Sequence, residues 1–353
     1  MHTRSRTLAL VVGAFLLQPL GATWAQTMSG AGSSAAAPIY KTWAREYQKA
    51  SGIALNYDPA GSSAGIKKIA AAEVDFGASD VAPSSAELNQ LGLVLFPVAI
   101  TGIAPVLNLP KIGEGKLKLS ADVLARIFLG DITHWNAREI AALNGELPLP
   151  DLPIKVVVRS DGSGTTYNFA DFLAKVSPQW STRFGVKTSY TWPDTHIAVK
   201  GSSGVVKAIK DTPGSIGYVD YGYVAENGLN YAQVQNPNGT FVKPTTEAFR
   251  SALLASEWAS KGAFGTTLTQ MPGKSSWPIT MGTYVLVPKV TDKPEATQRA
   301  LKFFAWSFTH GDALVQESSF VRLPDRVQAL AYRAISSVRD KSGAAIGAGA
   351  LSM

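Results

Sequence analysis

The sequence predicts an α/β protein with a largely parallel sheet and two domains. Apolar stretches typical of strands alternate with stretches in which apolar residues recur every three or four positions, as on one face of a helix. Three short Gly/Ser/Thr clusters lead directly into such helical stretches. The length of 353 residues, with 46% hydrophobic and 17% charged residues, is that of a folded chain with two domains.

The first elements follow the order helix, strand, helix, strand. The first helix is indicated by Pro38, which suits an early helical turn, and by Ile39, Trp43 and Tyr47, which recur every four residues. A strand at residues 53–57 follows it. This order is typical of α/β units, in which helices connect parallel strands.

The remaining elements are predicted from the same two patterns. In chain order they are a helix from Ile66 to about residue 72, strands at 74–78, 93–100 and 102–107, a helix and turn at 122–135, a strand at 154–159, a helix at 167–176, strands at 216–219 and 284–287, and closing helices around 304–308 and 327–335. The strand at 93–100 ends near a predicted crossover between the domains. The Gly-rich tail from Ser342 onward is predicted to be frayed.

Residues 1–25 are predicted to be a cleaved signal peptide. A basic start, a short apolar core at residues 8–20 and small residues up to Ala25 form this pattern, with Ala22 as a second candidate for the cleavage position. The apolar core is shorter than the ~20 residues that a membrane-spanning helix needs. No second long apolar stretch follows, so the mature chain is expected to be exported and soluble.

Composition excludes several classes of protein. There is no Cys, and therefore no disulfide framework, thiolate metal site or lipid anchor on an N-terminal Cys. Export without disulfides fits a bacterial periplasm. Removal of Arg4 and Arg6 with the leader lowers the formal charge from +7 to +5, and the chain has no Lys/Arg runs. Nucleic-acid binding is therefore not supported.

The Gly/Ser/Thr clusters at residues 30–34, 61–65 and 161–166 are predicted anion-binding segments. A helix start leaves backbone N–H groups unpaired and carries a partial positive charge. Gly allows a ligand to approach the backbone, and Ser or Thr adds a hydroxyl. Three such starts predict that they converge on one small, multiply charged oxyanion. A fourth cluster at residues 201–204 is interpreted as a helix cap.

Two charged residues lie where predicted strands end. Arg159 closes one strand and Asp80 follows another, and in open α/β sheets ligands bind beyond the carboxyl ends of the strands. Arg159 offers an oxyanion a planar fork of donors. Asp161 is predicted to hold the Arg159 guanidinium in place rather than to contact the ligand.

Asp80 indicates that the ligand itself carries a proton. An ionised carboxylate only accepts hydrogen bonds, so it repels a fully ionised anion but receives the O–H of hydrogenphosphate or dihydrogenphosphate. Sulfate has no proton at neutral pH and would leave Asp80 facing a like charge. The pattern therefore predicts selection by a built-in repulsive group.

A serine hydrolase is the alternative from another functional class. Residues 61–65 read Gly-Ser-Ser-Ala-Gly and match the G-x-S-x-G nucleophile motif. Such an enzyme needs a histidine base, and outside the leader the chain has only His134, His196 and His310. None lies in a context typical of a triad, and their spacing is not that of metal ligands. The motif match is interpreted as accidental.

With these residues the chain resembles the periplasmic phosphate-binding proteins that serve bacterial ABC phosphate transporters. The resemblance extends along essentially the whole mature chain. Its specific motifs are Asp-Phe-Gly-Ala-Ser-Asp at 75–80 and Asp-Gly-Ser-Gly-Thr at 161–165. Further matches lie at 29–32, 38–40, 57–65, 127–132, 135, 214–221 and 277–279.

The resemblance implies both a fold and a binding site. The fold would have two α/β lobes joined by crossover strands, lobe I at 26–100 and 281–353 and lobe II at 101–280, closing on phosphate in a cleft. By position, phosphate would be bound by Ser34, the Ala35 N–H, Ser62, Asp80, Arg159, Ser163, Gly164 and Thr165, with Asp161 as the partner of Arg159.

The resemblance also implies a function without catalysis, metal or cofactor. The protein would be a periplasmic monomer that binds inorganic phosphate and delivers it to a membrane permease. The family usually has Thr and then Phe-Pro shortly after the first Gly-Ala-Gly, where this chain has Ser34-Ala35-Ala36. Hydroxyl and N–H are kept, but the loss of aromatic bulk is expected to loosen this lip of the cleft. Arsenate or a phosphonate therefore stays as an alternative ligand, and phosphate-ester hydrolysis as an alternative activity.

Overall fold

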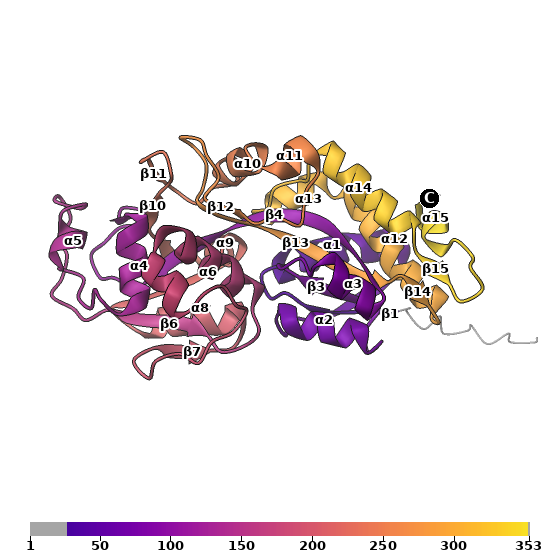
Figure 1. The fold of residues 1–353 in the computed structure, drawn as a ribbon, viewed down its shortest axis with the longest axis horizontal. Helices are drawn as coiled ribbons and strands as arrows, with labels where there is room; N and C mark the ends of the chain where they lie inside the picture. The colour runs from indigo at the N-terminus through magenta and orange to yellow at the C-terminus, as the bar shows by residue number, and fades with distance from the viewer. Residues whose placement is uncertain (1–26, 352–353) are drawn as a thin grey trace, which may run out of the picture.

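The computed structural model describes residues 27–351. The predicted signal peptide and its cleavage position lie outside the described residues. One long mixed sheet with the order β2-β1-β3-β13-β4-β8-β6-β7 organises the fold. Figure 1 shows two α/β lobes, with β4 (Leu93–Leu107) running from one into the other. None of the helices within 27–351 combines the length and the apolar character that a membrane span requires.

Lobe I contains both ends of the described part of the chain, residues 27 and 351. Its elements are β1 (Thr27–Gly32), α1 (Ala37–Ser51), β2 (Ala54–Asp58), α2 (Ser62–Ala70), β3 (Phe76–Ser79), α3 (Ser85–Leu91), β13 (Ile279–Pro288), β14 (Val290–Thr291), α12 (Pro294–His310), α13 (Asp312–Glu317), α14 (Asp325–Ser336), β15 (Arg339–Asp340) and α15 (Ile346–Leu351). Here β1 pairs in parallel with β2 and β3, and β13 pairs antiparallel with β3 and β4.

Lobe II is formed by the middle of the chain. Its elements are β5 (Lys118–Leu119), α4 (Ala121–Leu129), α5 (Arg138–Ala141), β6 (Lys155–Arg159), α6 (Gly164–Val176), α7 (Pro178–Arg183), β7 (Ile197–Val199), α8 (Gly201–Asp211), β8 (Ser215–Asp220), α9 (Tyr221–Asn227), β9 (Asn230–Tyr231), β10 (Gln233–Gln235), β11 (Phe241–Val242), α10 (Thr246–Leu254), α11 (Glu257–Lys261) and β12 (Leu268–Thr269). Here β6 pairs in parallel with β7 and β8, and β8 pairs antiparallel with β4. These lobe assignments follow the predicted boundaries after residues 100 and 280, which stay a prediction; in Figure 1, α10 and α11 lie beside α13 and α14 of lobe I, and α11 contacts α14.

Two predictions on single elements are wrong. The predicted strands 93–100 and 102–107 form one strand, β4, which pairs with β13 along its first part and with β8 along its second. Gly102 does not break this strand; a Cβ there would lie 2.0 Å from the Phe249 ring, so the glycine makes room for that ring. The tail from Ser342 is not frayed, because it ends in α15, where Gly347 lies against the Ile335 carbonyl and Ala350 is buried.

Aromatic side chains fill the core of lobe I. Tyr40 and Trp43 on the buried face of α1 contact Phe76 of β3 and the Phe303–Phe304 pair of α12 through edge-on or tilted ring contacts. Such pairs add about 0.5–1.5 kcal/mol each to the area that they bury. They fix α1, and with it the turn that precedes α1, on the sheet.

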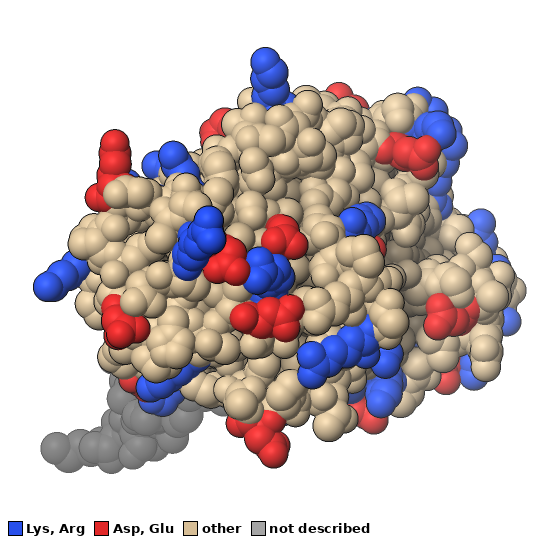
Figure 2. Space-filling model, turned by 60° about the vertical axis from the view of Figure 1, so that its left-hand side comes forward, with Lys and Arg blue, Asp and Glu red and all other residues tan. Residues whose placement is uncertain are grey.

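Charges of both signs alternate on the surface. On the face shown in Figure 2, the Lys and Arg side chains are interspersed with Asp and Glu, and no broad field of one sign covers it. The excess of positive charge in the sequence is therefore not gathered into a stripe on this face.

A glycine sets the distance between α2 and the sheet. A Cβ on Gly65 would lie 2.5 Å from the Ala78 carbonyl oxygen and 2.6 Å from the Gly32 Cα. The helix backbone thus lies directly on β1 and β3. Its first residue, Ser62, is thereby brought to the carboxyl ends of these strands.

We predict that Gly65→Ala lowers the free energy of unfolding by about 2 kcal/mol, because α2 must move away from backbone atoms that cannot yield. Urea unfolding of the ligand-free protein measures this loss. Gly145→Ala is the matched control, since a Cβ at exposed Gly145 meets no atom within 4 Å. Equal unfolding midpoints for the two variants would contradict the proposed close contact.

Candidate anion-binding site

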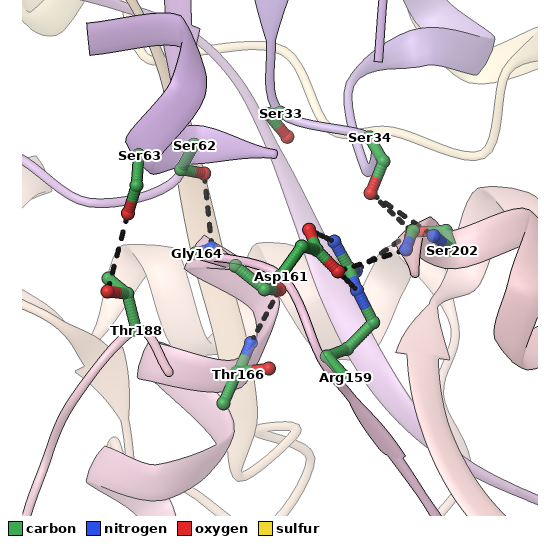
Figure 3. Close-up of polar contacts among 12 residues, drawn as sticks. Ser33, Ser34, Ser62, Ser63, Arg159, Asp161, Gly164, Thr166, Thr188 and Ser202 are labelled. Atoms are coloured by element: carbon green, nitrogen blue, oxygen red, sulfur yellow. Dashed lines mark hydrogen bonds and ion pairs between the residues drawn. The ribbon is translucent and has the colours of Figure 1, made fainter. Parts of the chain in front are cut away.

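The three predicted clusters meet at the junction of the two lobes. Figure 3 shows Ser34 from the turn after β1 and Ser62 from α2 facing Arg159 of β6 and Gly164 of α6. The polar residues that line this junction are almost completely buried: Ser33, Ser34, Ser62, Asp80, Arg159, Ser163, Thr165 and Ser202. Because β1 and β3 in lobe I and β6 in lobe II all end here, loops distant in sequence come together.

Direct hydrogen bonds join the lobes around this site. The Gly164 N–H donates to Ser62 Oγ over 3.1 Å, and the Asn168 side-chain amide donates to the Asp80 carbonyl over 2.8 Å. Ser63 N–H donates to the Gly162 carbonyl over 3.0 Å. The structure therefore has its lobes in contact, and the site is enclosed between them.

Arg159 and Asp161 form a buried, two-bonded ion pair. Arg159 Nε lies 2.7 Å from Asp161 Oδ1, and Arg159 Nη2 lies 2.5 Å from Oδ2. Burial raises the pKa of Asp161, but the hydrogen bonds and charge of Arg159 and the Gly201 N–H outweigh it, so the pKa is lowered overall. Asp161 thus stays ionised, orients the guanidinium and neutralises its charge.

The Asp80 carboxylate is surrounded by hydroxyls. Ser33 Oγ lies 2.7 Å from each of its oxygens, and Ser62 Oγ lies 3.5 Å from Oδ2. Burial raises the pKa of Asp80 from 3.8 to about 6, and the hydrogen bond of Ser33, the nearby Thr283 hydroxyl and the charge of Arg159 limit the rise. Asp80 is therefore mostly ionised at neutral pH, and no cation balances its charge in the way that Arg159 balances Asp161.

A second buried carboxyl, Asp220, lies at the end of β8. Burial and the charge of Asp80 raise its pKa well above the ordinary value, which favours its neutral form. The ionised groups of the site are then one positive charge, on Arg159, and two negative charges, on Asp161 and Asp80. An anion that binds here must therefore be held by hydrogen-bond donors rather than by net positive charge.

Donors for an anion are present on α6. The Ser163 side chain caps this helix by accepting the Thr166 N–H over 3.1 Å. The Thr165 hydroxyl, in the first turn, is buried and has no hydrogen-bond partner. A buried polar group without a partner is costly, so this hydroxyl is an observation that indicates a ligand.

The segment Ser34-Ala35-Ala36, which departs from the family pattern, is buried. Ala35 and Ala36 are 1% and 0% exposed and belong to the core at the start of α1. The expected effect of the missing aromatic side chain on ligand affinity stays a prediction. The segment itself is well packed.

Ser202 was missed by the sequence interpretation, which took residues 201–204 only as a helix cap. Its hydroxyl lies 2.9 Å from Ser34 Oγ and 3.4 Å from Arg159 Nη1, so it connects the two lobes through the site. The signal was present, since this cluster has the same Gly/Ser composition and helix start as the other three.

The Ser62 hydroxyl has no histidine among its partners. It contacts the Asp80 carboxylate, the Asp80 N–H and the Gly164 N–H. The three histidines bind elsewhere: His134 to Thr133, His196 to Thr195 and the Phe128 carbonyl, and His310 to Thr309. Among the described residues, the geometry gives the hydrolase interpretation no histidine base.

Comparison with known proteins places the chain in a family. Residues 18–310 match the model of the PBP superfamily domain. The phosphate-binding protein PstS of Haemophilus influenzae is 44% identical over 300 residues, which cover 85% of this chain and 90% of that protein. PstS of Pasteurella multocida is 43% identical over 327 residues, 93% of this chain and 94% of that protein. The chain belongs to the PstS family of the PBP superfamily.

Solved structures agree on the fold. A phosphate-binding protein from Stenotrophomonas maltophilia superposes with a TM-score of 0.67 at 20% identity, covering 93% of this chain and 98% of that one. The predicted two-lobed α/β fold is confirmed. The family consists of substrate-binding proteins.

We predict that Asp80→Asn makes the ligand-free protein more stable at pH 7.5, by about 1–3 kcal/mol. The native pKa of Asp80 lies above the unfolded value of 3.8, so the native state holds this proton more tightly. The resulting stability is present in full below about pH 4 and is lost as the pH rises through about 6. Urea unfolding from pH 4 to 8 measures it.

The variant should accordingly lose the part of the difference in stability between pH 4 and 7 that comes from Asp80, while Asp220, whose pKa is also raised by burial, supplies a further part in both proteins. Asp151→Asn, at an exposed aspartate, is the control and should leave the pH profile unchanged. A wild type that gains stability between pH 4 and 7, relative to Asp80→Asn, would show that the sign is wrong.

Proposed function

We propose that this protein binds inorganic phosphate in the periplasm and delivers it to the permease of an ABC transporter for import. The observation that carries the proposal is the buried Asp80 carboxylate in an otherwise anion-binding site. A ligand with its own proton can donate to Asp80, whereas a fully ionised anion meets a like charge there. The names of the PstS relatives support phosphate as that ligand.

The site residues are proposed from this geometry. The bound phosphate would be contacted by Ser34, the Ala35 N–H, Ser62, Asp80, Arg159, Ser163, Gly164 and Thr165, with Asp161 holding Arg159. The buried Thr165 hydroxyl supports this assignment, because phosphate would supply the acceptor that it lacks. Arg159 Nη1 has only the 3.4 Å contact with Ser202 and is free to donate to a phosphate oxygen.

Phosphate would act as the bridge between the lobes. Ser34, Ser62 and Asp80 belong to lobe I, and Arg159 and the α6 start belong to lobe II. A ligand that contacts both groups favours the state in which the lobes are closed. The hydrogen bonds between the lobes, such as that from Gly164 to Ser62, support a closed state of this kind. The predicted signal peptide supports the periplasmic location, and we expect the soluble form to be a monomer.

We predict that phosphate binds far more tightly than sulfate. Calorimetry with phosphate, arsenate, sulfate and a phosphonate on ligand-stripped protein measures the preference. Asp80→Asn should reduce the discrimination against sulfate, because it removes the like charge and supplies a donor. Arg159→Lys should instead weaken every anion by tenfold or more, because a point charge cannot replace a fork whose charge-assisted bonds contribute about 1.5–3 kcal/mol each.

Equal affinities of the wild type for phosphate and sulfate would refute the role of Asp80. Tighter binding of arsenate or a phosphonate than of phosphate would show that phosphate is not the preferred ligand, but the proposed binding site would still stand. Turnover of a phosphate ester would show that the protein is a hydrolase and would refute the proposed function in phosphate delivery.

A further inference from the structure

The Ser33 side chain is the nearest donor to Asp80. Ser33 is completely buried, and its Oγ lies 2.7 Å from both oxygens of the carboxylate. The contact follows from the sheet, because β1 pairs with β3 and the Ser33 N–H donates to the Ala78 carbonyl over 2.9 Å. Both residues belong to lobe I, so their contact does not depend on lobe II.

We propose that Ser33 determines the anion specificity of this site by keeping Asp80 ionised at neutral pH. This inference rests on the proposed phosphate-binding function. The Ser33 hydroxyl has one proton to donate, and its oxygen lies at the same distance from both carboxylate oxygens. The remaining lone pairs of Asp80 stay open to the proton of a ligand.

A hydrogen bond to the charged form of an acid opposes the effect of burial. Burial alone would favour a neutral Asp80, and the Ser33 hydroxyl is the largest of the groups that counteract it, so the pKa stays at about 6. A neutral Asp80 would donate a hydrogen bond and thereby accept a fully ionised anion. Without Ser33, the site would therefore admit sulfate near neutral pH.

The other charged or titratable groups near Asp80 come from several elements. They are Tyr40 of α1, Tyr57 of β2, Tyr284 of β13, Arg159 of β6 and Asp220 of β8. Burial raises the pKa of each tyrosine above 10, so these stay neutral, and Arg159 stays charged. Asp220 is the other carboxyl near Asp80 whose pKa is raised by burial, so it needs its own control.

Ser33 also has a structural contact. Its Oγ accepts the Ala36 N–H over 3.1 Å in the turn that leads into α1. Loss of this bond would change stability, but it would not move the titration of Asp80. The pH profile therefore separates a specificity role from a structural one.

The experiment measures sulfate affinity from pH 5 to 8 by calorimetry, in competition with phosphate where binding is weak. The variants are Ser33→Ala, Ser33→Thr and Asp220→Asn. In the wild type, sulfate affinity should rise as the pH falls through about 6. In Ser33→Ala this rise should begin at higher pH, and a shift of one pH unit would increase sulfate affinity at pH 7 roughly five-fold, because the neutral fraction rises from about a tenth to a half.

Ser33→Thr should keep the wild-type midpoint, because it keeps the hydroxyl. Asp220→Asn should also keep it. The carbon-13 shift of the Asp80 carboxyl, assigned with Asp80→Asn, reports the same midpoint without any ligand. If Ser33→Ala does not fold, Ser33→Gly removes the same hydroxyl.

An unchanged midpoint and an unchanged ratio of sulfate to phosphate affinity in the variant without the hydroxyl would overturn the inference. A larger shift in Asp220→Asn than in Ser33→Ala would also overturn it. These failures differ from failure of the proposed function, in which the wild type itself would not bind phosphate.

Discussion

A buried negative charge without a balancing cation, that of Asp80, is the constraint on which the site depends. Among residues 27–351, Arg159 is the only cation of the site, and Asp161 neutralises it through two hydrogen bonds. The site therefore cannot collect anions by net charge and must recognise them by the placement of donors and acceptors. In the proposed phosphate complex, hydroxyls and helix-start N–H groups would provide the donors, and Asp80 would provide the acceptor that selects for a ligand proton.

The fold encloses this site by packing the backbone at the start of α6 directly against residues of lobe I. A Cβ on Gly164 would lie 2.5 Å from Ser62 Oγ and 2.7 Å from the Asp80 Cβ, and one on Gly162 would lie 2.5 Å from Ser63 Oγ. These two glycines of lobe II allow the start of α6 to lie directly against Ser62, Ser63 and Asp80 of lobe I. The same contacts remove Asp80 from water, which raises its pKa, and the neighbouring hydroxyls and Arg159 limit that rise.

Much of this arrangement could be predicted from the sequence, because local patterns carry it. The strand-to-helix order, the Gly/Ser clusters and the charges at strand ends all depend on short segments, and the structure brings Ser34, Ser62, Asp80, Arg159 and the 163–165 segment together. The assignment of these residues to phosphate stays a prediction.

Local sequence patterns do not show which distant segments contact one another in the fold. The contact of Ser202 with Ser34 spans 168 residues and depends on how the lobes approach. The contact of Ser33 with Asp80 depends on the pairing of β1 with β3. The predicted break before Gly102 and the predicted fraying of the tail from Ser342 are both wrong, because Gly102 and Gly347 mark close packing rather than flexibility.

The central claim is that an ionised Asp80 accepts a proton carried by the ligand. Neutron diffraction from crystals of the phosphate complex, grown in heavy water near pH 7, tests it most directly. We expect a deuterium bonded to a phosphate oxygen and directed at Asp80, with the Ser33 deuterium directed at the same carboxylate. A deuterium bonded to Asp80 itself, or a fully ionised phosphate with none directed at Asp80, would contradict the account.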